Sequence, residues 1–210
     1  MKKIIKISLI LLLLGMAVIA AVLFFKEKRA ERKYENEFKN IQESVTEKKS
    51  DVNGLVKKNK DCIGYVEIPG TTISYPVMQT KDNPDFYLNH DFNRNYSFYG
   101  TPYLSAYCDV NKSDNLIIYG HNINGGKMFG ALERYKDKEF FNKHRKIYFI
   151  TDKKREYEEF VDKVAEKSLW KTGDKPRHGG QILMLSTCDN GRGDDWRIVV
   201  IGRNIMSECV

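Results

Sequence analysis

A cysteine, a histidine and an arginine stand at the ends of short apolar segments of this 210-residue chain. Cys188 follows an apolar run that begins at Ile182, and Arg197 precedes a second run that ends at Ile201. Both runs are too short for a helix, and the glycines, aspartates and asparagine between them are turn formers. The pattern predicts two strands joined by a polar loop, with Cys188 at the C-terminal end of the first strand.

These side chains suit acyl transfer through a thioester. The thiolate is the form of cysteine that attacks, and a fixed positive charge such as Arg197 favours it. His121 ends the segment NLIIYGH, which we interpret as another buried strand. A thiol, an imidazole and a guanidinium at strand ends supply a nucleophile, an acid–base group and an oxyanion donor. A lone cysteine in an apolar strand is more often a core side chain, but the two neighbours favour a catalytic Cys188.

The segments around these residues resemble the sortase family of Gram-positive cell-surface transpeptidases, and class B in particular. The resemblance rests on LSTC at 185–188 with a downstream arginine, and on IIYGHN at 117–122, in that order. It covers about 62–204 and includes IGYVEIPGTTISYPVMQ, DNPDFYLNHDF, GTPYLS and MFGALERYKDKEFFNKHRKIYFIT. It implies a mainly β fold: a closed sortase-type β-barrel with peripheral helices.

The resemblance also implies a cysteine transpeptidase that uses Cys188, His121 and Arg197. Cys188 would attack the carbonyl of a threonine inside a C-terminal sorting signal, and the thioester would pass to an amine of a peptidoglycan precursor or a pilin. His121 would move protons, and Arg197 would bind the oxyanion, with Arg192 as the alternative donor. Surface proteins that bear sorting signals are the expected partners.

Metal, cofactor and disulfide sites find little support. The four histidines are scattered along the chain, and no CxxC motif occurs. Cys62, Cys108 and Cys209 lack the spacing of a disulfide framework. We therefore expect neither a metal nor a cofactor.

The positive charge of the chain is concentrated at its N-terminus. The formal net charge is +7 and the pI is near 9.1. Residues 1–33 hold eight Lys or Arg against two Glu, a net charge of +6. Because only +1 remains for the rest of the chain, no nucleic-acid partner is predicted.

The apolar run from Ile7 to Phe25 is long enough for a helix that crosses a bilayer. It exceeds the roughly 7–15 residues of a signal-peptide core, so an uncleaved anchor is favoured over a cleaved signal peptide. More basic residues follow the run than precede it, so the positive-inside rule alone would place the domain in the cytoplasm. The family resemblance instead implies a single-pass cell-membrane protein whose catalytic domain is extracellular.

The sequence divides into four parts on this interpretation. Residues 1–6 form a short basic tail, 7–25 the transmembrane anchor, 26–61 a charged helical linker and 62–205 the sortase catalytic domain. Apolar residues of the linker follow helical spacing and suit one docked helix. A coiled-coil dimer is the alternative, although at most two heptads are present.

Within the catalytic domain, Pro69-Gly70 predicts a turn between strands at 62–68 and 72–77. Pro84 to Asp91 is interpreted as a short helix. The apolar spacing after His121 indicates helical packing, and 146–151 indicates a further strand.

The segment after Thr151 departs from the class B pattern. A further strand and a long loop are expected before a helix, whereas DKKRE here leads directly into EYEEFVDKVAEKSLW, which has helical spacing. We expect the barrel edge beside the groove to be open to another chain, with weaker and less selective binding of sorting peptides. A second departure is Met184, where the family commonly has Thr. The alternative function is a membrane-tethered, sortase-like β-domain that is catalytically weak or inactive and acts in binding.

Overall fold

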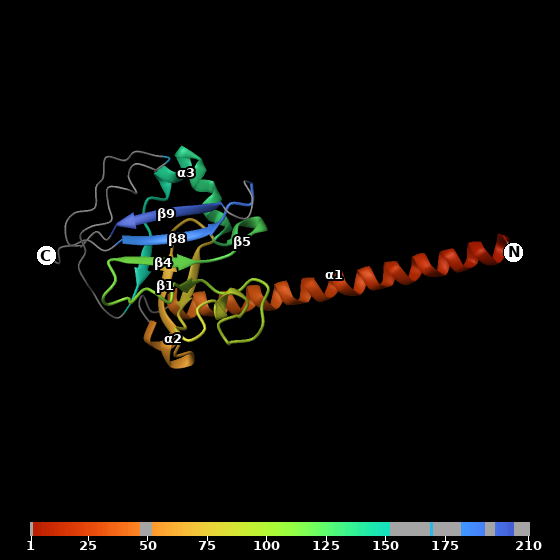
Figure 1. Cartoon of the computed structure of the whole chain (residues 1–210), viewed down its shortest axis with the longest axis horizontal. Coiled ribbons are helices and arrows are strands. Elements are labelled where there is room, and N and C mark those ends of the chain that lie inside the picture. The colour runs from red at the N-terminus through yellow and green to blue at the C-terminus, as the bar shows by residue number, and fades with distance from the viewer. Residues whose placement is uncertain (1, 47–51, 152–168, 170–181, 192–195, 204–210) are drawn as a thin grey trace. The chain divides into compact units, whose positions relative to one another are not determined.

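The computed structural model describes residues 2–46, 52–151, 169, 182–191 and 196–203, and Figure 1 shows their arrangement. These residues form three α-helices, nine strands and three 3-10 helices. The elements follow in the order α1 (Lys2–Thr46), α2 (Val52–Lys58), β1 (Cys62–Glu67), β2 (Ser74–Met78), η1 (Phe86–Leu88), β3 (Tyr103–Leu104), β4 (Asn115–Tyr119), β5 (Asn122–Ile123), η2 (Asn124–Gly126), β6 (Lys127–Met128), η3 (Gly130–Lys136), α3 (Lys138–Lys143), β7 (Tyr148–Ile150), β8 (Ile182–Cys188) and β9 (Arg197–Arg203).

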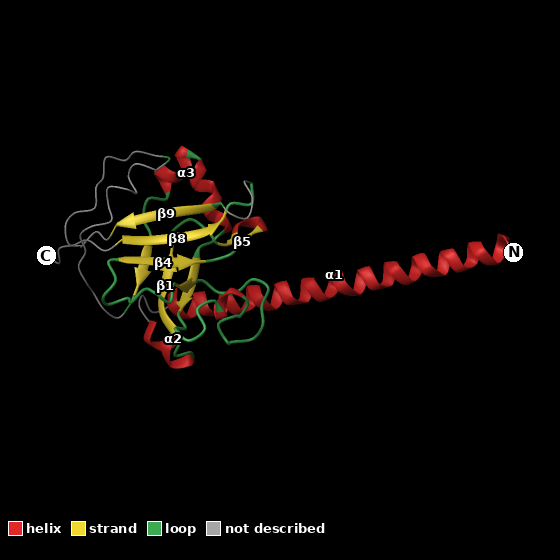
Figure 2. Cartoon of the chain, in the orientation of Figure 1, coloured by secondary structure: helices red, strands yellow, loops and turns green. Residues whose placement is uncertain are grey.

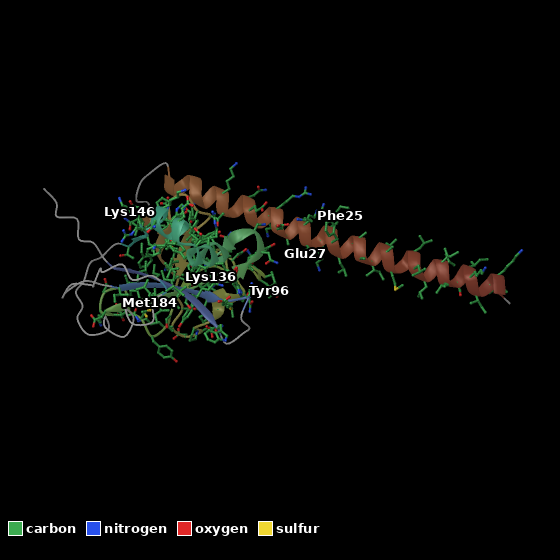
Figure 3. All side chains as sticks on the ribbon, turned by 90° about the horizontal axis from the view of Figure 1, so that it is seen from above. Phe25, Glu27, Tyr96, Lys136, Lys146 and Met184 are labelled. Atoms are coloured by element: carbon green, nitrogen blue, oxygen red, sulfur yellow. The ribbon has the colours of Figure 1, made fainter. Side chains whose placement is uncertain are left out.

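The N-terminal part of the chain is the long helix α1. It is the one helix of the described residues that is long and apolar enough to cross a membrane, over Lys3–Lys33. The apolar side chains from Ile7 to Phe25 are exposed along it, and Figure 3 labels Phe25. The helix runs through the expected boundary between residues 25 and 26 without a break. Residues 1–44 and 45–210 form two separate compact units.

The second unit is built on a seven-stranded sheet with the order β7-β1-β2-β3-β4-β8-β9. The pairs β2–β3 and β4–β8 are parallel, and the other neighbours are antiparallel. Figure 1 shows β4 and β8 pointing in the same direction, with β9 running back beside β8. A separate two-stranded ribbon pairs β5 with β6. Figure 2 shows how strands dominate this unit.

The core lies on the inner face of the sheet. Alternate residues of β4, Leu116 and Ile118, are buried there, as period-2 alternation requires of a strand that faces a core on one side. Leu185 of β8 is fully buried as well. Phe129 and Leu132, at and inside η3, are also fully buried. The apolar spacing after His121 therefore marks helical packing, as the sequence predicted.

Two local predictions are confirmed in the first hairpin. The strands expected at 62–68 and 72–77 are β1 and β2. Between them Gly70 has a φ of 77°, a backbone conformation that glycine adopts without steric cost. The Ile68 amide donates to the Ile73 carbonyl at 2.9 Å and closes the turn.

The prediction of a closed barrel is corrected. The sheet is a curled half-barrel whose order ends at β7 and β9, and no strand pairing joins these edges within the described residues. β7 has only three residues, and among the described strands its ladder partners all lie in β1. The two edges nevertheless lie close together. A Cβ atom at Gly202 of β9 would lie 3.5 Å from Cδ1 of Ile147, the residue before β7.

The predicted strand loss after Thr151 and the helix expected in EYEEFVDKVAEKSLW fall on 152–168 and 170–181. These ranges lie outside the described residues. The expectation of weaker peptide binding therefore stays a prediction.

Candidate active site

Cys188 and Arg197 face each other across the antiparallel pair β8–β9. Cys188 is the last residue of β8, Arg197 is the first of β9, and the two are register partners. The Asp189 amide donates to the Trp196 carbonyl at 2.9 Å, so the ladder continues one step past the cysteine. Cys188 is half-buried and Arg197 is exposed. The hairpin thus places the thiol and the guanidinium at the same end of the sheet.

The parallel pair β4–β8 brings His121 to this end. Tyr119, the last residue of β4, is the register partner of Ser186 in β8, and the same register continued by two residues sets His121 level with Cys188. Beyond Tyr119, the Gly120 amide donates to the Ser186 carbonyl at 3.2 Å, and the Thr187 hydroxyl donates to the Gly120 carbonyl at 2.7 Å. These bonds join the YGH and STC motifs, which are 67 residues apart. His121, two residues past the end of β4, and Cys188, the last residue of β8, therefore lie at the same end of neighbouring strands.

The His121 ring is oriented by a backbone carbonyl. Its Nε2 lies 2.9 Å from the oxygen of Leu88. A carbonyl only accepts hydrogen bonds, so Nε2 carries a hydrogen and, in the neutral ring, Nδ1 is the basic nitrogen. Gly100 passes close over the same carbonyl: a Cβ atom there would collide with the Leu88 oxygen, and its φ is 58°. Within the described residues no hydrogen bond joins the Cys188 thiol to the imidazole, a geometry common before substrate binds.

Comparisons with known proteins agree with this geometry. The sortase domain family model matches residues 66–205. The chain belongs to the sortase family. It is 28% identical to sortase B of Staphylococcus aureus (strain NCTC 8325 / PS 47) over 229 aligned positions, which cover 94% of this chain and 92% of the relative. It is 30% identical to sortase B of Listeria monocytogenes serovar 1/2a over 186 positions, 75% of each chain.

Solved structures give the same result. The structure of a Staphylococcus aureus sortase B–substrate complex aligns with a TM-score of 0.69 at 25% identity, over 85% of this chain and 97% of that one. The resemblance to class B sortases is thereby confirmed, and the chain is a sortase-type cysteine transpeptidase.

The Arg197 side chain of this sortase bonds to the backbone of the residue before it. Nη1 of Arg197 donates to the carbonyl of the preceding Trp196 at 3.1 Å. Arg192, the alternative oxyanion donor, lies outside the described residues. Met184, the departure from the family pattern, is buried on β8 and packs with Ile182 and Ile117. Because Met184 is the register partner of Ile117, this small apolar cluster lies on the face of the sheet opposite Ile118 and Leu185, away from the Cys188 end of β8.

Sequence reasoning missed two side chains at the site. Asn122, directly after His121, donates from Nδ2 to the Cys188 carbonyl at 2.8 Å. Tyr103 of β3 donates its hydroxyl to Asp85 at 3.0 Å. Burial raises the pKa of Tyr103 well above its ordinary value, and electrostatic interactions with Asp85 and Cys188 act in the same direction. Asn122 lies inside IIYGHN and Tyr103 inside GTPYLS, but no local spacing rule assigns either residue to the site.

The described part of the sortase contains no group of three or more His, Cys, Asp or Glu side chains that could hold a metal ion. The sequence expectation of no metal and no cofactor stays a prediction for the chain as a whole.

Thiol labelling is expected to select Cys188 over Cys62. Cys62 is 2% exposed, and burial raises the pKa of its thiol to about 11. At pH 7 that pKa leaves only about one thiolate in ten thousand at Cys62, and thiolates are the reactive form. Iodoacetamide at pH 7 followed by peptide mass spectrometry should find the label on Cys188 and leave Cys62 unmodified until the protein unfolds. Labelling of Cys62 in the folded protein would contradict this.

Thr187→Val is expected to weaken the junction between β4 and β8. Valine keeps the shape but removes the donor to the Gly120 carbonyl, and a buried group that loses its partner costs about 1–3 kcal/mol. Thermal unfolding should show this loss, and peptide cleavage should fall with it. Thr80→Val is the matched control, because Thr80 donates to the Asn83 carbonyl at an exposed site. Equal stability losses in the two variants would contradict a special role of Thr187.

Proposed function

We propose that this sortase cleaves a C-terminal sorting signal after threonine and transfers the protein to a cell-wall amine. Cys188 Sγ attacks the threonine carbonyl carbon, and the amide C–N bond breaks. Protonated His121 gives its proton to the departing amine, so the substrate's C-terminal tail leaves as a neutral amine. The product of this half-reaction is a thioester on Cys188.

The second half-reaction restores the enzyme. An incoming amine attacks the thioester carbonyl and loses a proton to His121 as the new amide bond forms. The C–S bond breaks, and Cys188 leaves as thiolate beside the reprotonated imidazole. The amine of a peptidoglycan precursor or of a pilin is the proposed acceptor, and no cofactor takes part.

Arg197 is the proposed oxyanion donor. Negative charge develops on the carbonyl oxygen in both half-reactions, and preorganised donors aimed at that oxygen supply a large part of the acceleration. A guanidinium offers five N–H donors in a planar fork, and the bond to the Trp196 carbonyl occupies one of them. That bond restrains the side chain at the first residue of β9.

The observation that carries this proposal is that three neighbouring strands bring their functional residues to the same end of the sheet. β4 leads to His121, β8 ends at Cys188, and β9 begins at Arg197. A solved structure of Staphylococcus aureus sortase B holds a substrate, and this likeness supports a substrate-processing role for the present chain as well.

The proposed function is tested with the full-length chain in detergent micelles. A library of fluorogenic peptides that each contain one threonine serves as substrate, and hydroxylamine serves as a small amine acceptor. A thioester intermediate converts to a hydroxamate at the threonine, which mass spectrometry detects. Cleavage with hydroxamate formation is the expected result. Binding of peptides without cleavage would instead support the alternative, a sortase-like domain that acts in binding.

We further propose that Ile7 to Phe25 anchors the chain as a single pass in the cell membrane, with the catalytic domain outside and surface proteins as clients. Protease added to intact spheroplasts should then digest the catalytic domain. An epitope tag fused before residue 1 should stay protected until the membrane is permeabilised. Protection of the catalytic domain with digestion of the tag would show the opposite orientation.

A further inference from the structure

We propose that Glu133 and Lys136 of η3 are positioning residues that fix the backbone around Cys188, at the end of β8. Glu133 acts through Asn122, and Lys136 acts on Asp189, the residue after the cysteine. This inference rests on the proposed role of Cys188 and deepens it.

The first contact runs through the side-chain amide of Asn122. Its Nδ2 donates to the Cys188 carbonyl at 2.8 Å and to Glu133 Oε1 at 2.8 Å. An amide NH2 group has two hydrogens, so these two acceptors use both and define the orientation of the amide. The other side of the amide packs tightly too, because a Cβ atom at Gly130 would lie 3.1 Å from Asn122 Oδ1.

This contact sets the spacing of the two reacting groups. Asn122 directly follows His121 in the chain, and its partner is the carbonyl of Cys188 itself. Because no hydrogen bond joins the thiol to the imidazole within the described residues, their separation depends on such links between the two backbones. A misplacement of about 1 Å can cost about 100-fold in rate.

The second contact is the ion pair between Lys136 Nζ and Asp189 Oδ1 at 2.9 Å. The Asp189 side chain is 6% exposed and that of Lys136 is 44% exposed. A buried carboxylate needs a partner, because removing one member of a buried pair leaves an uncompensated charge. Asp189 Oδ1 also accepts from the Gly191 amide at 3.2 Å, so the carboxylate organises the start of the β8–β9 loop.

The 3-10 geometry of η3 explains why both contacts reach the same end of the sheet, next to Cys188. In a 3-10 helix the side chains at i and i+3 eclipse each other, which places Glu133 and Lys136 on one face. Leu132 is fully buried, and the Tyr135 hydroxyl donates to the His144 carbonyl at 2.7 Å, so the segment is packed on its other side. Figure 3 labels Lys136 on this segment and Met184 on β8.

Three variants test the proposal in the full-length chain. Glu133→Ala removes the acceptor of Asn122, and Glu133→Gln keeps an acceptor oxygen. Lys136→Met removes the charge and keeps the length of the stem. We expect Glu133→Ala and Lys136→Met to lower kcat by about 10- to 100-fold with little change in KM. Glu133→Gln should recover much of the loss in Glu133→Ala.

The readouts separate positioning from a loss of fold. Thermal unfolding identifies any variant that is not folded, and the rate of Cys188 alkylation by iodoacetamide against pH reports the surroundings of the thiol without turnover. A folded positioning variant should change this pH profile together with kcat. If Glu133→Ala does not fold, Lys136→Met decides, because its side chain is partly exposed. Lys143→Met is the control, because Lys143 pairs with Glu139 at an exposed site on α3.

Two outcomes would overturn the proposal. One is kcat and an alkylation profile like the wild type in both Glu133→Ala and Lys136→Met. The other is a fall in kcat in Lys143→Met as large as that in Lys136→Met. It would mean that the loss of an ion pair lowers kcat through general stability and not through the position of Cys188. Cys188→Ala is run in parallel. Full activity of Cys188→Ala would refute the proposed function itself. An inactive Cys188→Ala beside fully active Glu133→Ala and Lys136→Met would refute only the positioning role.

Discussion

Cys188→Ala is expected to abolish both cleavage of the sorting signal and transfer to the amine. The thiol is the proposed nucleophile, and loss of the nucleophile in a covalent acyl-transfer enzyme lowers kcat by about a millionfold. The fold should remain intact, because Cys188 is half-buried at the end of β8 and its contact with Asn122 uses the backbone carbonyl. The hydroxamate assay measures the activity, and thermal unfolding measures the stability.

Cys108→Ala is the matched control for this prediction. Cys108 is 7% exposed, and its thiol donates to the Asn115 carbonyl at 3.3 Å. Its loss should lower stability, by about 0.5–3 kcal/mol as for most substitutions, and leave the chemistry unchanged. Turnover by Cys188→Ala at the wild-type rate would end the proposal that Cys188 is the nucleophile.

Arg197→Lys is expected to be severely impaired although the charge is kept. A lysine ammonium is a point charge on a flexible stem and does not reproduce the planar fork of a guanidinium. Loss of one oxyanion donor typically lowers kcat by about 100- to 1,000-fold. We therefore expect kcat to fall by this amount, with a much smaller change in KM, in steady-state cleavage of the best library peptide.

Arg192→Lys distinguishes the two candidate donors. Arg197 starts β9 and is the register partner of Cys188, so its backbone is fixed relative to the nucleophile. Arg192→Lys should accordingly retain most activity. If it is the crippled variant and Arg197→Lys is active, the oxyanion donor is Arg192, and the role proposed for Arg197 is wrong.

Local patterns in the sequence determined the elements of the site. Apolar runs bounded by turn formers predicted a strand that ends at Cys188 and a strand that starts at Arg197, and β8 and β9 have these bounds. The turn at Pro69-Gly70 was predicted for the same reason. Such features depend on steric and hydrogen-bonding preferences of a few adjacent residues, which the sequence displays directly. The order of the His, Cys and Arg motifs indicated the family.

Only the tertiary structure decided how these elements meet. Alternation of apolar residues shows which side chains face a core, but it does not choose the neighbouring strand or the register. The decisive hydrogen bonds join residues far apart in the chain: His121 to Leu88 across 33 positions, and Asn122 to Cys188 across 66. The same limit applies to the corrected barrel, since the sheet of the described residues ends at β7 and β9 and only long-range pairing could join its edges. Long-range pairing is set by the packing of the whole sheet, and no local pattern in the sequence encodes it.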